Sequence, residues 1–294
     1  MEFTQLSDIA EYCQREQKDM AAAMLDYEMR NKGLTRSQVY ASLKRVLLVM
    51  EESVDQGLTQ EVITPSGMLE NWAKRVYQHR VDTLGAALKK ATARAIAVGE
   101  VNACMGRIAA APTAGSAGIM PAVLVTMMEE HGVPREKILD GLLVSSAVGL
   151  IFARNSSFAG SEAGCMGETG SAAAMGAAVI TYLLGGSNEQ ILESVSFALK
   201  ASMGLVCDPV AGLVEEPCTT RNAVGVANAF VSAQMALAGI RSLIPADEVI
   251  AATKEVGDLM SPRLKESGQG GLANTKTGRE IQKRVFETMR AEKK

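Results

Sequence analysis

Aromatic and imidazole side chains are scarce in this chain of 294 residues: aromatic residues make up 4%, and there are two histidines. His79 lies in the charged segment KRVYQHRVD, and His131 lies at the predicted end of a helix, where it meets the helix dipole favourably. We therefore expect surface positions for both, and neither is a good candidate for a buried catalytic base. Alanine, glycine and methionine are abundant instead, and they let helices pack closely.

A strong positive charge is also missing, since the net charge is −3 and the isoelectric point is about 5.6. This balance argues against a nucleic-acid-binding surface. The first residues are charged rather than apolar, so no secretory signal is expected. The five cysteines are an odd number, and we expect free thiols in a reducing cytoplasm.

Strongly apolar segments of membrane-spanning length are absent as well. Three stretches carry no charge, but they are rich in Ala, Gly, Ser and Thr rather than in Leu, Ile and Phe, the residues that drive insertion. These stretches are residues 108–128, 169–188 and 222–240. We expect them to be buried helices at the centre of a helical protein, and we predict no membrane association.

Sustained alternation of apolar and polar residues, the pattern of a half-buried strand, does not occur. Helical spacing recurs instead, and the helix start and stop signals predict an all-α fold. The first helix should end before Gly33. The predicted helix starts are Ser7 or Asp8, Thr35 with Gln38, Pro134, Ser187 with Gln190, Pro245, and Thr277 with Glu280.

The chain has no low-complexity linker and no internal repeat, which favours a single large helical domain over residues 1–294. Residues 1–95 are charge-rich and amphipathic, so we expect them to wrap around the rest. Residues 96–294 should form the core, with buried Ala/Gly-rich central helices, and the C-terminal helices.

Three cysteines stand in unusual surroundings, in the segments SEAGCMGETG, GLVCDPVAGLV and EEPCTTRN. Cys165, Cys207 and Cys218 are separated by 42 and 11 residues, unlike the compact spacings of zinc ribbons or ferredoxins. One interpretation is that they are small buried hydrophobic residues. Their Gly, Pro and acidic neighbours favour loops instead. Three such loops could bring the thiolates to one metal or cluster and leave a coordination position open.

The segments GCMGETGSAAAMGAA, GLVCDPVAGLVEEPCTTRNA and PTAGSAGIMPAVL resemble those of the iron–sulfur-dependent L-serine dehydratases. Nearly the whole chain resembles the separate α subunit of the two-subunit bacterial form. The resemblance implies that Cys165, Cys207 and Cys218 hold a [4Fe–4S] cluster with one iron free of protein ligand. That iron would act as a Lewis acid on the 3-hydroxyl of L-serine, which is converted to pyruvate and ammonia. Cys13 and Cys104 lie outside the motifs and receive no ligand role.

A glycine loop, residues 112–118, precedes an apolar run that should be helical, and its backbone N–H groups could bind an anion. A tight turn between packed helices is the alternative, and the resemblance favours binding of the serine carboxylate. Arg221 could hold the same carboxylate or cap a helix. A second glycine segment, 267–273, could line the pocket or form a surface loop. The candidate substrate-binding residues are Thr113, Gly115, Ser116, Gly118 and Arg221.

The resembled family carries a Ser-Ser-Ser-His-Thr motif with a proposed catalytic histidine, and this chain lacks that motif. In the two-subunit form the motif belongs to the β subunit. We therefore expect a β subunit as partner and the general base on that partner. Glu162, Glu168 and Asp208 could act as base instead, or they could simply orient loops.

Three other functions fit some of these features. An L-cysteine desulfidase would expel sulfide in place of hydroxide from the same kind of site. A non-catalytic iron–sulfur sensor or electron carrier would hold a cluster without binding substrate. A pyridoxal-phosphate dehydratase would need an α/β scaffold and a Schiff-base lysine, which the helical pattern does not favour.

Overall fold

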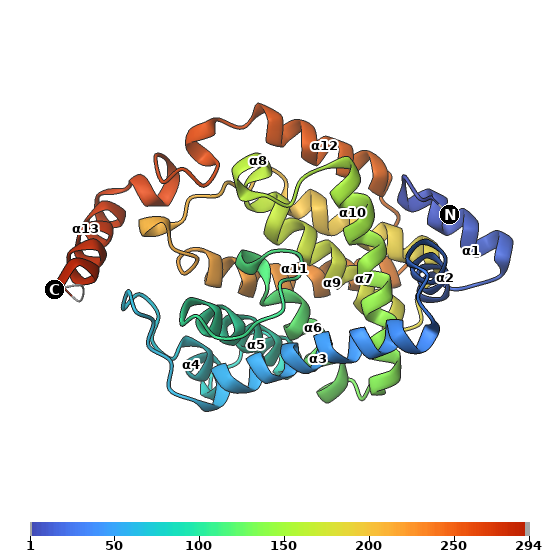
Figure 1. Ribbon diagram of the computed structural model, residues 1–294, viewed down its shortest axis with the longest axis horizontal. Helices are drawn as coiled ribbons and strands as arrows, with labels where there is room; N and C mark the ends of the chain where they lie inside the picture. Colours follow the sequence, from blue (N-terminus) through green and yellow to red (C-terminus); the bar gives the residue numbers. More distant parts are fainter. Residues whose placement is uncertain (1, 292–294) are drawn as a thin grey trace.

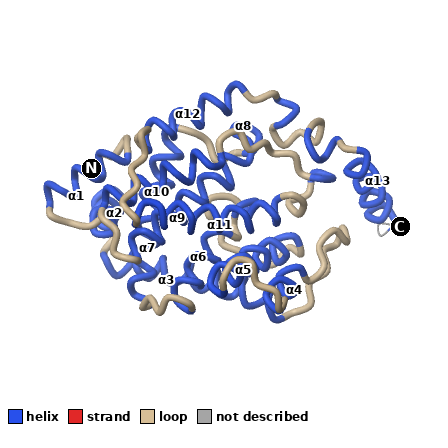
Figure 2. Tube along the Cα trace, turned by 180° about the vertical axis from the view of Figure 1, so that it is seen from behind, coloured by secondary structure: helices blue, strands red, loops and turns tan. Residues whose placement is uncertain are grey.

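The computed structural model describes residues 2–291, and in this part of the chain all regular elements are helices, as the sequence predicts (Figures 1 and 2). The α-helices are α1 (Leu6–Glu16), α2 (Met20–Lys32), α3 (Arg36–Thr59), α4 (Trp72–Gln78), α5 (Ala86–Ala103), α6 (Ile119–Glu129), α7 (Arg135–Asn155), α8 (Gly160–Cys165), α9 (Ser171–Leu183), α10 (Asn188–Ser202), α11 (Cys218–Leu237), α12 (Ala246–Leu259) and α13 (Lys276–Ala291). Short helical turns are η1 (Ala114–Ser116), η2 (Met166–Gly170), η3 (Val210–Gly212), η4 (Pro262–Leu264) and η5 (Gly271–Asn274).

Helix α9 forms the centre of the fold, and all thirteen of its residues are buried. Its sequence, SAAAMGAAVITYL, is small and apolar on every side, which is typical of a helix surrounded by other helices. Helices α7, α10 and α11 pack around it, and α6 contacts it as well. The prediction of buried Ala/Gly-rich central helices is therefore confirmed, and the three uncharged stretches supply α6, α9 and α11.

The remaining helices lie around this centre. Helices α1 and α2 lie at one end, and the long α3 runs along one side to α5 (Figure 1). Helix α12 crosses the opposite side, and α13 lies at the other end, where it packs on η3 and η5. The predicted boundary between the wrapping part and the core part, at residue 95, falls inside helix α5, so one continuous helix joins the two parts. The division of the chain at this residue stays a prediction.

Three of the predicted helix boundaries are wrong. The first helix begins at Leu6 and not at Ser7 or Asp8, because Gln5 is its N-cap and Asp8 lies in the first turn, where it accepts a hydrogen bond from the Gln5 amide. The segment up to Gly33 is two helices, because Gln17 adopts a left-handed conformation and Asp19 starts a new helix by accepting a hydrogen bond from the Ala22 amide at 2.8 Å. The last helix begins at Lys276, because the hydroxyl of Thr275 accepts a hydrogen bond from the Gly278 amide at 3.1 Å.

The other helix starts agree with the structure. Both predicted capping boxes, Thr35 with Gln38 and Ser187 with Gln190, have their reciprocal hydrogen bonds. Pro134 and Pro245 stand immediately before α7 and α12.

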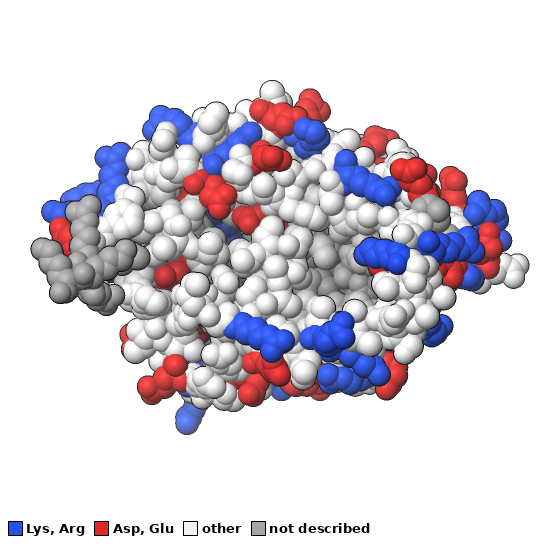
Figure 3. All heavy atoms as spheres, in the orientation of Figure 1, with Lys and Arg blue, Asp and Glu red and all other residues white. Residues whose placement is uncertain are grey.

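The surface has no dominant charge of either sign on the face seen in Figure 3. Lys, Arg, Asp and Glu side chains are interspersed around its rim, and a broad central area carries few of them. Within residues 2–291, no helix combines the length and apolarity needed to span a membrane.

Candidate functional site

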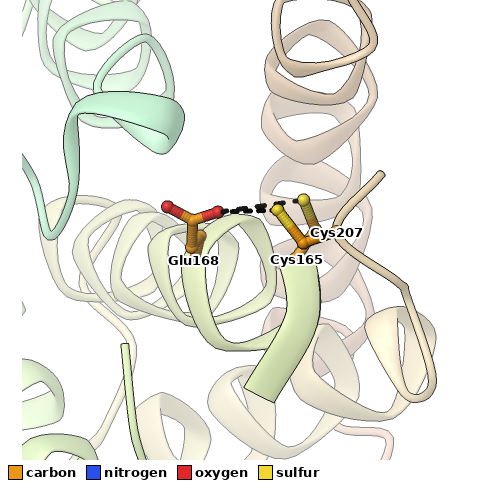
Figure 4. Close-up of side chains that lie close together, drawn as sticks. All are labelled: Cys165, Glu168 and Cys207. Carbon is orange, nitrogen blue, oxygen red and sulfur yellow. Dashed lines mark hydrogen bonds between the residues drawn. The ribbon is translucent and has the colours of Figure 1, made fainter. Parts of the chain in front are cut away.

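Two thiols and a carboxylate meet where α8 runs into α9. Cys165 ends α8, and the π-helical turn η2 follows it directly and carries Glu168. The Sγ atoms of Cys165 and Cys207 lie 3.9 and 3.8 Å from Glu168 Oε2 (Figure 4). All three ligand atoms lie within 4.8 Å of one another. π-Helical turns inside helices are frequent at functional sites, because they widen the turn and redirect side chains.

Cys218 reaches the same region from the start of α11, of which it is the first residue. It lies outside the 4.8 Å group of ligand atoms. Arg221, one helical turn later on α11, donates to the Sγ of Cys165 at 3.3 Å. Residues three apart lie on the same side of a helix, so the Cys218 side chain lies on the side of α11 that faces Cys165.

The prediction that all three cysteines lie in loops is wrong for two of them. Cys165 and Cys218 are terminal residues of helices, where Gly and Pro mark the boundary, and only Cys207 lies in an extended segment. All three thiols are free and buried.

The acidic residues next to these cysteines are also buried, whereas their charge predicts positions outside a packed core. Asp208 is 3% exposed and Glu215 is 4% exposed. Each has a partner outside its own turn: Arg221 on α11 donates to Asp208 Oδ1 at 2.7 Å, and the hydroxyl of the distant Ser66 donates to Glu215 Oε2 at 2.6 Å. Buried carboxylates need such partners, because desolvation otherwise disfavours them strongly.

The thiols differ in their electrostatic surroundings. A hydrogen bond from Cys207 and the positive charge of Arg221 lower the pKa of Cys165 despite its burial. The hydrogen bond to Cys165 and burial raise the pKa of Cys207, and burial raises the pKa of Cys218. Cys165 is therefore the thiol most readily deprotonated, and thiolates are the form that binds metals.

Glu168 connects the cysteines to the predicted glycine loop. The hydroxyl of Thr113 donates to Glu168 Oε1 at 2.8 Å, and Thr113 and Ser116 form a reciprocal capping box around η1. A Cβ atom at Gly115 would lie 3.1 Å from Glu168 Oε1. Burial raises the pKa of Glu168, which favours its neutral form relative to an exposed glutamate.

Close packing against α5 explains why position 118 is a glycine, and the sequence alone does not reveal this contact. A Cβ atom there would lie 2.3 Å from the carbonyl oxygen of Ala95 on α5, so the loop lies directly on that helix. The Gly118 amide donates to Asn222 Oδ1 at 2.9 Å, and Asn222 Nδ2 donates to the carbonyl oxygens of Gly115 and Cys218 at 2.7 and 2.8 Å.

Asn222 also belongs to the site, although no role was predicted for it. Its side chain is 2% exposed and joins the glycine loop to the start of α11. The signal was present in the sequence, because an amide side chain opens an otherwise small and apolar stretch. Such a residue, when buried, needs hydrogen-bond partners from other elements.

Other predicted residues lie outside this group. His79 and His131 are exposed, as expected. Cys13 is buried on α1, and Cys104 caps the end of α5.

A pocket of about 790 Å³ lies beside the site between α10 and α11. Its lining includes the charged residues Arg221 and Glu216 and apolar residues such as Val224 and Val231. Arg221 therefore belongs both to the pocket wall and to the thiol group.

The donor set suits a soft metal or an iron–sulfur cluster, which thiolates bind preferentially. The surroundings also leave room next to the donors, because Gly160 has no side chain where a Cβ atom would lie 2.9 Å from both Cys207 Sγ and Glu168 Oε2. The position of Cys218 outside this group suits a cluster better than a single metal ion. The ligands of a cluster bind different metal atoms, so their sulfur atoms need not lie as close together as the ligands of one ion.

Comparisons with known proteins show which family this chain belongs to. Residues 9–273 match the family model described as serine dehydratase alpha chain. A Peptoniphilus asaccharolyticus protein named L-serine dehydratase, alpha chain, is 44% identical over 94% of this chain and 96% of its own. A Bacillus subtilis (strain 168) protein named "Probable L-serine dehydratase, alpha chain" is 42% identical over 97% and 95%.

This chain also matches part of a longer relative. L-serine dehydratase TdcG of Escherichia coli (strain K12) is 31% identical over 92% of this chain, but the match covers 62% of that protein. With a family match over most of its length and relatives above 40% identity, this chain belongs to the serine dehydratase alpha chain family.

Proposed function

We propose that this chain is the cluster-bearing subunit of a cytoplasmic L-serine dehydratase, a carbon–nitrogen lyase that converts L-serine to pyruvate and ammonia. Cys165, Cys207 and Cys218 would hold a [4Fe–4S] cluster. When bound, the cluster would supply a Lewis-acidic iron for the 3-hydroxyl of the substrate. The observation that carries the proposal is the group of Cys165, Cys207 and Glu168 ligand atoms within 4.8 Å, with Cys218 on the adjoining face of α11.

The chain's own residues would position the substrate. The loop that carries Thr113, Gly115, Ser116 and Gly118 lies against Glu168, beside the thiols, where it could receive the serine carboxylate. Arg221 contacts the Cys165 thiol and also lines the pocket. Its guanidinium would keep positive charge near that carboxylate, which suits paired hydrogen bonding.

A β subunit carrying the Ser-Ser-Ser-His-Thr type motif would complete the enzyme. Relatives named alpha chain match this chain over nearly their full length, whereas the match covers 62% of TdcG. The remaining part of such longer proteins is what a separate subunit would replace. Apolar side chains exposed on α11 support a partner surface there, since Val224 is 70% exposed and Val231 is 54% exposed.

The general base would come from that partner, because both histidines of this chain lie on its surface. Glu168 and Asp208 would then hold neighbouring groups in place. Each already contacts groups of this chain: Thr113 and two thiols for Glu168, and Arg221 for Asp208.

The test is the iron and sulfide content of the chain after oxygen-free purification, for the wild type and for Cys165→Ala, Cys207→Ala and Cys218→Ala. We expect each variant to lose most of the iron. Cys104→Ala is the matched control, because this thiol lies outside the site, and it should keep the wild-type content. Full iron content in all three site variants would refute the ligand assignment.

Substrate choice is tested separately. With the partner subunit supplied under oxygen-free conditions, L-serine should release pyruvate faster than L-cysteine does. The reverse order would identify a desulfidase, and no turnover of either would favour a sensor or electron carrier.

A further inference from the structure

Cys207 is held in place by a segment more than fifty residues later in the chain. The Cys207 amide donates to the carbonyl oxygen of Leu264 at 2.9 Å, and its carbonyl oxygen accepts from the Glu266 amide at 2.7 Å. The two segments thus form an isolated parallel bridge between Cys207 and Lys265. We call residues 262–275 the strap. Because Cys207 lies outside the helices, these backbone bonds fix its position as an intrahelical ladder would.

The next residue ties the strap down with its side chain. Asp208 Oδ2 accepts a hydrogen bond from the Leu272 amide at 2.6 Å, and Oδ1 accepts one from Arg221 Nη2 at 2.7 Å. The same guanidinium donates through Nη1 to Cys165 Sγ at 3.3 Å and to the carbonyl oxygen of Val206 at 2.8 Å. One buried carboxylate therefore joins the strap to the residues around both thiols.

Gly271 shows how closely the strap approaches Asp208. A Cβ atom on Gly271 would lie 2.2 Å from Asp208 Oδ2, so no other residue fits without displacing the carboxylate. Gly271 also has a φ of +59°, a conformation that glycine adopts readily. Gly268, on the same strap, has a φ of +67° but nothing within 4 Å of a Cβ atom.

We propose that the strap, anchored by Asp208, fixes Cys207 and Arg221 at the site, and that Asp208 is a positioning residue. The role of Cys207 as a cluster ligand rests on the proposed function, whereas the positioning by the strap does not need a cluster. Release of the strap would free the Cys207 backbone. It would also take the Leu272 amide away from Asp208 Oδ2, so the carboxylate that holds Arg221 Nη2 would lose one of its two hydrogen bonds. It would leave the helical core intact, because neither Cys207 nor the strap belongs to an α-helix.

The first experiment measures how fast a maleimide labels Cys207 in the metal-free chain, with mass spectrometry to locate the label. Gly271→Ala should raise the rate about tenfold or more, because overpacking against Asp208 opens the strap. Gly268→Ala is the matched control with the same backbone preference, and it should label at the wild-type rate. Cys13, which is 1% exposed on α1, should stay protected in every variant and so reports that the fold is intact.

A second variant changes Asp208, the other partner in the contact with the strap. Asp208→Asn keeps an oxygen acceptor for the Leu272 amide but loses the charge facing Arg221, so labelling should rise less than in Asp208→Ala. The proposal is overturned if Gly271→Ala and Asp208→Asn both label Cys207 at the wild-type rate, or if Gly268→Ala accelerates labelling as much as Gly271→Ala does.

Iron loss in air provides the second measurement. Iron should leave Gly271→Ala several times faster than Gly268→Ala. A wild-type chain that never holds iron would refute the proposed function, while the labelling of the metal-free chain would still decide whether the strap positions Cys207.

Discussion

The close approach of the glycine loop to α5 leads to a quantitative prediction for Gly118→Ala. The backbone at Gly118 has φ −76° and ψ −26°, which alanine adopts without strain, so the substitution tests packing alone. The added Cβ atom would lie 2.3 Å from Ala95 O and 3.0 Å from Asn222 Oδ1. A backbone carbonyl on a buried helix cannot rotate away as a side chain can, so the loop must move.

We expect this overpacking to cost about 1–3 kcal/mol of folding free energy. For a chain of this size the melting temperature should fall by roughly 2–10 °C. The movement would also weaken the hydrogen bond from the Gly118 amide to Asn222 Oδ1, because the amide is part of the displaced loop.

Thermal unfolding followed by circular dichroism measures the effect, with Gly149→Ala as the control. Gly149 lies inside α7, and a Cβ atom there would meet Met175 Cε at 3.7 Å, an ordinary contact. Alanine should therefore stabilise that helix by up to about 1 kcal/mol. If Gly118→Ala melts at or above the wild-type temperature, the loop is not confined by α5 and the steric explanation for Gly118 is refuted.

Three further predictions concern the scaffold. Gly57→Ala should destabilise the protein by about 1–3 kcal/mol in urea unfolding, because a Cβ atom would lie 2.5 Å from the carbonyl oxygen of Ala97; a gain in stability would contradict this. Burial and the hydrogen bond to Asp140 raise the pKa of Tyr40 to about 12, so stability from this contact is present below pH 10 and is lost as the pH rises toward 12. In Tyr40→Phe, the free energy of unfolding measured at several pH values should therefore fall less between pH 10 and pH 12 than in the wild type. Glu100→Gln should lower the free energy of unfolding by about 1–3 kcal/mol, because the Glu100 carboxylate accepts hydrogen bonds from the first two backbone amides of α4. These two amides should then exchange their hydrogens faster than in the wild type.

Local signals were enough to predict most of the helical architecture. Capping boxes mark helix starts in this chain because their hydrogen bonds connect residues three apart. Prolines mark them because a residue without an N–H group fits at the start of a helix and not in its interior. The break at Gln17 does not follow from the local pattern, because the surrounding residues continue a helical pattern and only the cap at Asp19 interrupts it.

The composition of the site was predictable only in part. The three cysteines stand out through their neighbours, but the burial of Asp208 and Glu215 depends on Arg221 and Ser66, which a reading of local sequence does not pair with them. The hydrogen bonds of Asn222 likewise join residues about a hundred positions apart. Contacts of this range follow from the packing of helices and not from any local pattern.

The order of the segments along the chain has a consequence for biosynthesis. A ribosome makes Cys165, Cys207 and Cys218 before it makes residues 262–275, the segment that encloses Cys207. During that interval the thiols exist on a nascent chain without their enclosure. For the proposed cluster, delivery of iron and sulfide would therefore meet less resistance during this interval than after residues 262–275 have closed over Cys207.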